Sequence, residues 1–157
     1  MKTHELRSLQ GLRQLREQRA ASQLAAQQRR CWQTHDVLED ARKRLSKHRE
    51  CIAHEAESLF GRFSEGLSVA AWQAAQERLQ VLEYDQRQLE SSVHKVRQIL
   101  DGQELERDVF RTARAARQRQ VDAWQMLVER REGIERLVDE RREEVDELFT
   151  VPLGGER

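Results

Sequence analysis

Apolar residues recur at every seventh position through the first part of the chain. Seven-residue spacing places one stripe of side chains along one side of an α-helix, where a second helix covers it. The pattern predicts a helix over residues 3–60, with Thr3 as its N-cap. Leucines before residue 17 follow three-residue steps, so we expect the stripe to change phase around residues 17–21. The seven-residue series consists of Leu24, Cys31, Leu38, Leu45, Ile52 and Leu59.

A second apolar run, with alternating four- and three-residue steps, follows a short break bracketed by Gly61 and Gly66. It predicts a second helix over residues 68–149, with Ser68 as its N-cap and Pro152 beyond its end. With a turn near residues 61–66, the predicted fold is all-α, a long antiparallel two-helix coiled-coil hairpin. The second stripe consists of Ala75, Leu79, Leu82, Leu89, Val93, Val96 and Leu100.

The hairpin is predicted to occupy residues 1–149 as a single domain, and residues 150–157 are predicted to form a flexible tail. The rival fold is a three-helix bundle in which the second helix breaks at Gly102. A lone interior glycine costs a helix only about 1 kcal/mol relative to alanine, so the two-helix hairpin is favoured. Disorder is the alternative for a chain with 36% charged residues, and the sustained heptads argue against it.

The second predicted helix is longer than the first, so its end should lack a partner. Folding about the turn pairs residue n with about residue 129 − n, which puts the start of the chain beside residues 124–126. The helix beyond that level still carries apolar side chains, and a lone helix with an apolar stripe needs a partner to bury it. These side chains are Leu127, Ile134, Leu137, Val138, Val145 and Leu148.

Charge is balanced overall and uneven along the chain. Lys plus Arg and Asp plus Glu each number 28, which disfavours a dedicated nucleic-acid binder. Residues 1–30 hold seven basic and two acidic side chains, net +5, whereas residues 131–157 hold five basic and nine acidic, net −4. The hairpin brings Arg13 and Arg16 level with Arg114 and Arg117. This basic belt is either a solvated surface or a docking site for an acidic protein or, less favoured, RNA.

Nothing in the sequence has the pattern of an enzyme. There is no Gly-rich phosphate loop, nucleophile elbow or HExxH motif, and the scattered Cys and His residues lack zinc-ligand spacing. We therefore expect no catalytic, cofactor-binding or metal-binding residues. Without an apolar span, a secretory signal or a disulfide framework, the chain is predicted to be reduced and cytoplasmic. Trp72 and Trp124 are either hydrophobic caps of the coiled coil or binding anchors.

Two stretches resemble the flagellar export protein FliJ and its injectisome counterparts, the YscO/SctO proteins. The first is SEGLSVAAW at residues 64–72, with Leu79 and Leu82 after it, and the second is AWQMLVER at residues 123–130, with DELF at 146–149. The resemblance implies a cytosolic stalk of type III secretion that is not itself an enzyme. Its partners would be a hexameric secretion ATPase, the cytosolic domain of the export gate and secretion chaperones, and it would be peripheral to the inner-membrane export apparatus.

In that family the open end of the hairpin enters the ATPase pore and promotes assembly and activity. Leu82 matches a gate-contact position near the hairpin tip, whereas Arg78, Asp85 and Leu89 depart from the FliJ pattern, which favours an injectisome protein. The alternatives are a general coiled-coil adaptor with an unrelated partner, and an RNA-binding hairpin. The expected export-gate contacts are Trp72, Arg78, Leu82 and Leu89. The expected ATPase contacts are Arg13, Arg16, Arg114, Arg117, Trp124, Leu127, Ile134, Val138 and Val145.

Overall fold

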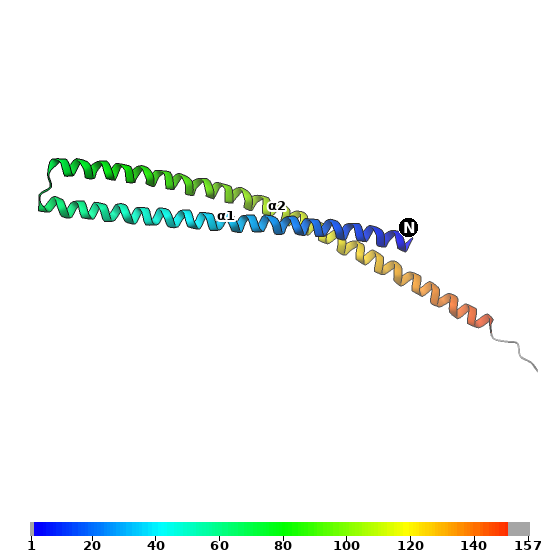
Figure 1. Ribbon diagram of the computed structural model, residues 1–157. Helices are drawn as coiled ribbons and strands as arrows, with labels where there is room; N and C mark the ends of the chain where they lie inside the picture. Colours follow the sequence, from blue (N-terminus) through cyan, green and yellow to red (C-terminus); the bar gives the residue numbers. More distant parts are fainter. Residues whose placement is uncertain (1, 151–157) are drawn as a thin grey trace, which may run out of the picture. The chain divides into compact units, whose positions relative to one another are not determined.

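The computed structural model describes residues 2–150 and contains two long helices, which confirms the predicted all-α hairpin (Figure 1). Helix α1 spans Thr3–Glu65 and helix α2 spans Val69–Phe149. They run antiparallel and are joined by a three-residue turn. Helix α2 is unbroken at Gly102, so the three-helix alternative is wrong. The predicted tail lies outside the described residues, except for Thr150.

Helix α1 begins with a cap that the sequence analysis did not predict. The backbone N–H of Lys2 donates to Glu5 Oε2 at 2.9 Å, and the Lys2 carbonyl accepts from Leu6 N–H at 3.2 Å. Glu5 therefore closes the reciprocal half of a capping box around Lys2. The prediction of Thr3 as N-cap is wrong, because its hydroxyl donates across to the Glu135 carboxylate.

The turn lies a few residues later than predicted. Helix α1 runs through Gly61 to Glu65, because one interior glycine is too weak a signal to end a long helix. Gly66 ends it instead, with a φ of 91° that a residue with a Cβ adopts only at a cost. Ser68 caps α2 as predicted, accepting from Ala71 N–H at 3.3 Å.

The chain divides into two compact units. Unit 2 comprises residues 25–109, and unit 1 comprises residues 1–24 together with 110–157. In unit 2 the predicted stripes meet as an apolar seam in which Cys31, Leu38 and Leu100 are buried, with Val93 and Val96 packed against them. Leu45 is also buried, as the heptad pattern predicted. Across this seam His48 Nε2 lies 2.7 Å from the Leu82 carbonyl oxygen.

In unit 1 the seven-residue frame continues without the expected phase change. Counting back from buried Leu24 in steps of seven gives Glu17, Gln10 and Thr3. All three of these polar side chains are half-buried. Leu9, Leu12 and Leu15 are exposed. Their three-residue steps belong to an outer face of α1, so the phase prediction was wrong because it followed the leucines and ignored the polar seam positions.

Candidate partner-binding surfaces

Polar contacts join the helices of unit 1 close to the N-terminus. Arg7 Nη2 lies 2.7 Å from Glu132 Oε1, and the hydroxyl of Thr3 donates to Glu135. The hydrogen bond from Thr3 lowers the pKa of Glu135 against the opposing effect of desolvation, and Arg131 lowers it further. The Glu135 carboxylate is therefore the acceptor at neutral pH. These contacts set the level at which α1 begins along α2.

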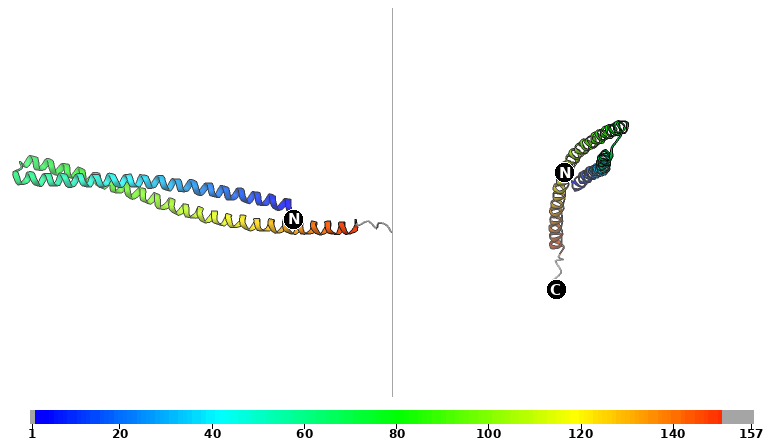
Figure 2. Two further views of the ribbon diagram at one scale, coloured as in Figure 1. Left: turned by 90° about the horizontal axis from the view of Figure 1, so that it is seen from below. Right: turned by 90° about the vertical axis from the view of Figure 1, so that its left-hand side faces the viewer.

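That level corrects the predicted overhang. The start of α1 lies beside Glu135 rather than beside residues 124–126, because Thr3 and Arg7 bond to side chains farther along α2 than the predicted pairing. Leu127 and Ile134 therefore lie alongside α1, although both remain exposed. The unpaired part of α2, here called the overhang, is residues 136–149, about 21 Å of helix. Figure 2 shows α2 running past the N-terminus of α1.

The overhang keeps the apolar phase of the seam. Val138 is 42% exposed and Val145 is 48% exposed, and they follow Trp124 and residue 131 at seven-residue steps. Shallow spaces of about 430 Å³ lie beside this part of α2, one lined by residues that include Ile134, Val138 and Arg142. The face of α2 that meets α1 before residue 136 therefore continues into the overhang, where no helix of unit 1 covers it.

The predicted basic belt is partly used inside the hairpin. Arg13 lies over the Trp124 ring, 4.7 Å from its centroid, and its Nη1 donates to Gln120 Oε1 at 3.2 Å. Arg114 Nε lies 3.2 Å from Glu17 Oε1. Arg16 and Arg117 are exposed. Arg13 and Arg114 therefore make contacts between the helices, whereas Arg16 and Arg117 are open to solvent.

Two seam residues of unit 1 were missed by the sequence analysis. Val121 and Val128 are buried, and they continue the seven-residue series of Leu100 along α2. Arg107 and Arg114 occupy the intervening positions of that series, which concealed its continuation. Trp124 lies between the two valines and is half-buried, consistent with the interpretation of a hydrophobic cap near the open end.

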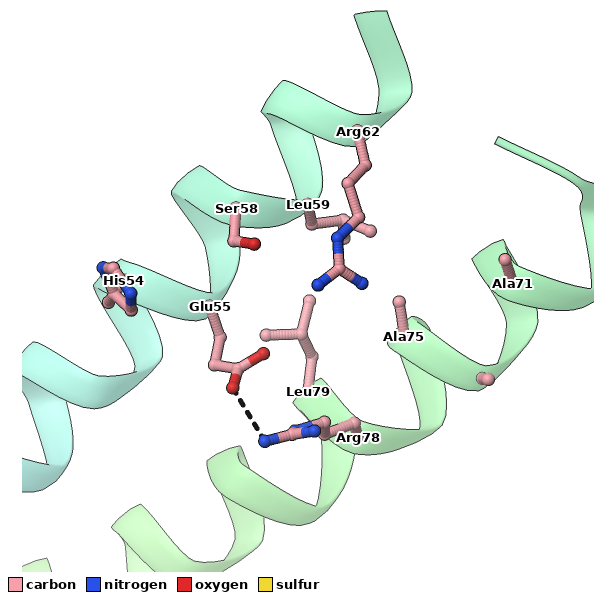
Figure 3. Close-up of a pocket in the computed structure, with 10 residues that line it drawn as sticks. His54, Glu55, Ser58, Leu59, Arg62, Ala71, Ala75, Arg78 and Leu79 are labelled. Atoms are coloured by element: carbon pink, nitrogen blue, oxygen red, sulfur yellow. Dashed lines mark ion pairs between the residues drawn. The ribbon is translucent and has the colours of Figure 1, made fainter. Parts of the chain in front are cut away.

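The turn end of unit 2 contains an open groove, and of the predicted gate residues Arg78 lines it. Trp72 packs against Phe63 with ring centroids 5.6 Å apart, and both retain exposed surface. Arg78 Nη2 lies 2.8 Å from Glu55 Oε1, and Figure 3 shows this ion pair crossing between the helices. Leu82 and Leu89 are half-buried. Arg78 and the two leucines thus have contacts or burial within the hairpin.

Small side chains on α2 create the groove itself. Its volume is about 580 Å³, and Ala71 and Ala75 face Leu59 across it while Arg62 extends into the space from α1 (Figure 3). Alanines leave the helices incompletely packed here. The groove is open, and its lining mixes apolar and charged side chains.

No protein-family model, curated protein or solved structure matches the chain. Within residues 2–150, no group of three His, Cys, Asp or Glu side chains is placed to hold a metal ion. No helix in that range has an apolar stretch long enough to cross a membrane. The candidate surfaces are the overhang, the exposed face of α1 with Leu9, Leu12 and Leu15, and the turn groove.

Proposed function

We propose that the protein is a cytoplasmic stalk of a type III secretion export apparatus, of the injectisome or flagellar kind. Its open end docks in the central pore of a hexameric export ATPase and promotes assembly and activity. Its turn end links the ATPase to the export gate, and the stalk serves the secretion chaperones. The support is the resemblance of residues 64–72 and 123–130 to the FliJ and YscO/SctO proteins, together with a two-helix hairpin.

The observation that carries this proposal is the overhang. Helix α2 continues past the last α1 contact, between Thr3 and Glu135, and still carries Val138 and Val145 in the phase of the seam. An apolar stripe on a single helix is stable when another surface covers it. The pore of an ATPase ring offers such a surface on all sides of one helix.

The exposed arginines of the belt would assist docking. Arg16 and Arg117 face solvent, whereas Arg13 and Arg114 are engaged across the hairpin. Exposed positive charge steers a partner with an acidic rim, and salt weakens this steering. One asymmetric helix pair inside six equivalent subunits makes unequal contacts with them. Unequal contacts favour particular subunit conformations, which would promote ring closure and sequential hydrolysis without a catalytic group on the stalk.

The test is ATPase stimulation by overhang variants. Truncation after Arg136 keeps the contact of Thr3 with Glu135 and removes Val138 and Val145. We expect it to abolish stimulation of the cognate ATPase, and V138E/V145E to do the same in the full chain. K43E/K47E, which changes two exposed residues of unit 2, is the matched control and should stimulate normally. Circular dichroism checks that each variant stays helical.

Full stimulation by the truncated protein, or no binding of the intact protein to the ATPase, would overturn the stalk proposal. The alternative is a general coiled-coil adaptor with an unrelated partner. The polar seam of unit 1 is compatible with it, because Glu17 and Arg114 occupy seam positions where a rigid coiled coil usually has apolar residues. An adaptor would bind its partner through the overhang without any effect on nucleotide hydrolysis.

A further inference from the structure

Unit 1 carries several exposed apolar side chains outside the seam. Single exposed leucines are ordinary on protein surfaces, whereas several on one side of a helix pair mark an interaction surface. We call this set the outer face. It comprises Leu9, Leu12 and Leu15 on α1 and Leu127, Ile134, Leu137 and Leu148 on α2.

The heptad frame places the middle of the outer face on one flank of the hairpin. In an antiparallel helix pair, the residues that follow the second seam position of each heptad face each other on one flank, and the residues that precede the first seam position face each other on the opposite flank. The ion pair between Arg7 and Glu132 identifies the first of these flanks. Leu9, Leu127 and Ile134 immediately precede first seam positions, so they belong to the other flank.

The two ends of the outer face carry opposite charge. Residues 2–19 hold five basic and two acidic side chains, net +3. The overhang, residues 136–149, holds three basic and six acidic side chains, net −3. Because α1 starts beside Glu135 and runs away from the overhang, the basic segment and the overhang of one chain do not pair with each other. An anionic lipid surface would attract the first and repel the second.

From this arrangement we propose that the outer face binds a second copy of the chain, antiparallel and related by a two-fold axis near residue 131. The charges align in this register. Arg13 contacts Gln120 and Trp124 and Glu17 contacts Arg114, so Arg16 lies level with about residues 115–118 of α2 and Arg19 with about residues 112–115. The two-fold axis then brings Glu144 and Glu147 of the second copy to the levels of Arg16 and Arg19.

The same register also pairs the apolar side chains at the centre of the interface. Leu127 of one copy meets Ile134 of the other across the axis, and Leu137 reaches the level of Leu9. The contact is isologous, so each pairing occurs twice and the assembly stops at a dimer. This inference does not depend on the proposed function, because the isolated chain should form the dimer. The dimer covers the outer face and part of the overhang, so the form that docks in an ATPase pore would be the monomer.

Charge exchange tests the pairing. Sedimentation equilibrium of the purified chain at low salt should give twice the chain mass of 18.6 kDa. R16E/R19E places acid against acid, and E144R/E147R places base against base, so each should weaken the dimer by about tenfold or more. An equimolar mixture of the two should recover the dimer, since both reciprocal contacts are then between opposite charges.

K43E/K47E makes the same charge change as R16E/R19E at exposed positions of unit 2 and should leave the dimer intact. L127Q/I134Q should dissociate the dimer and retain helical circular dichroism, because both side chains are exposed in the single chain. A monomeric wild-type chain, or a mixture of the two charge-exchanged variants that stays monomeric, would overturn the proposal. Loss of the dimer in K43E/K47E would also overturn it, because the charge dependence would then be non-specific.

Discussion

Gln27 is more buried than any leucine of the seam, with 2% of its surface exposed. Its Nε2 donates to the Gln103 carbonyl at 3.0 Å and to Glu106 Oε2 at 3.2 Å. A buried amide costs stability when its hydrogen bonds are unmade, and a single polar seam residue can fix the register of a coiled coil. Gln27 is therefore a residue that favours this pairing of helices over shifted alternatives.

The apolar seam of unit 2 should respond strongly to truncation of a side chain. Leu38 is 3% exposed and packs in the cluster with Cys31 and Leu100. We expect Leu38→Ala to lower the free energy of unfolding by about 2–4 kcal/mol, nearer the lower value because a two-helix seam is thin. Urea unfolding followed by circular dichroism measures it.

Leu105→Ala is the matched control within the same unit. Its side chain is 70% exposed, and leucine and alanine are both strong helix formers. Its effect should stay within about 0.5 kcal/mol. Equal losses for the two substitutions would mean that Leu38 does not lie in a dry seam.

Glycines have opposite roles at the scale of the helices. Gly102 lies inside α2 with nothing within 4 Å of where a Cβ would be, so only backbone entropy distinguishes it from alanine. Gly102→Ala should raise the free energy of unfolding by about 1 kcal/mol. Gly66 has equal room around its Cβ position but a φ of +91°. Gly66→Ala should therefore lower the free energy of unfolding, by about 1–2 kcal/mol.

Thermal and urea unfolding of the two glycine variants separate these effects, since the substitutions are chemically identical. A loss of stability in Gly102→Ala would indicate that α2 bends or opens at this position. An unchanged stability in Gly66→Ala would mean that the turn adopts another conformation.

At the scale of the whole molecule, the helices of unit 1 and the helices of unit 2 are held together by different interactions. The seam of unit 2 buries Cys31, Leu38, Leu45 and Leu100, whereas unit 1 combines the buried Val121 and Val128 with hydrogen bonds, ion pairs and the Arg13–Trp124 stacking contact along α1 residues 3–17. Exposed ion pairs each contribute about 0–1 kcal/mol, and salt screens them. The N-terminal part of α1 should therefore open locally far more readily than the unit 2 seam.

Hydrogen exchange measured by mass spectrometry tests this difference. Peptides from residues 3–20 should exchange faster than peptides from residues 30–55, and the gap should widen as salt increases. Glu17→Gln, which removes the charge facing Arg114, should speed exchange of residues 3–20 and leave residues 30–55 unchanged. Uniform protection along α1 would show that the polar contacts are as strong as the apolar seam.

The sequence by itself determined the secondary structure and the inward faces of unit 2. Heptad spacing is a property of a single helix, so Leu38, Leu45 and Leu100 were correctly assigned to the seam without knowledge of the partner helix. The Ser68 cap was also predictable, because it depends on hydrogen bonds within four residues. The continuity of α2 through Gly102 followed from the small cost of one glycine.

Only the tertiary structure decided the pairing of the helices and hence the candidate sites. Thr3 contacts Glu135 rather than residues 124–126, which shortened the overhang and put Leu127 and Ile134 beside α1. It also decided that Arg13 stacks on Trp124. The physical reason is that the level at which two helices meet depends on where the chain turns and on side chains far apart in sequence. A local pattern cannot specify such contacts.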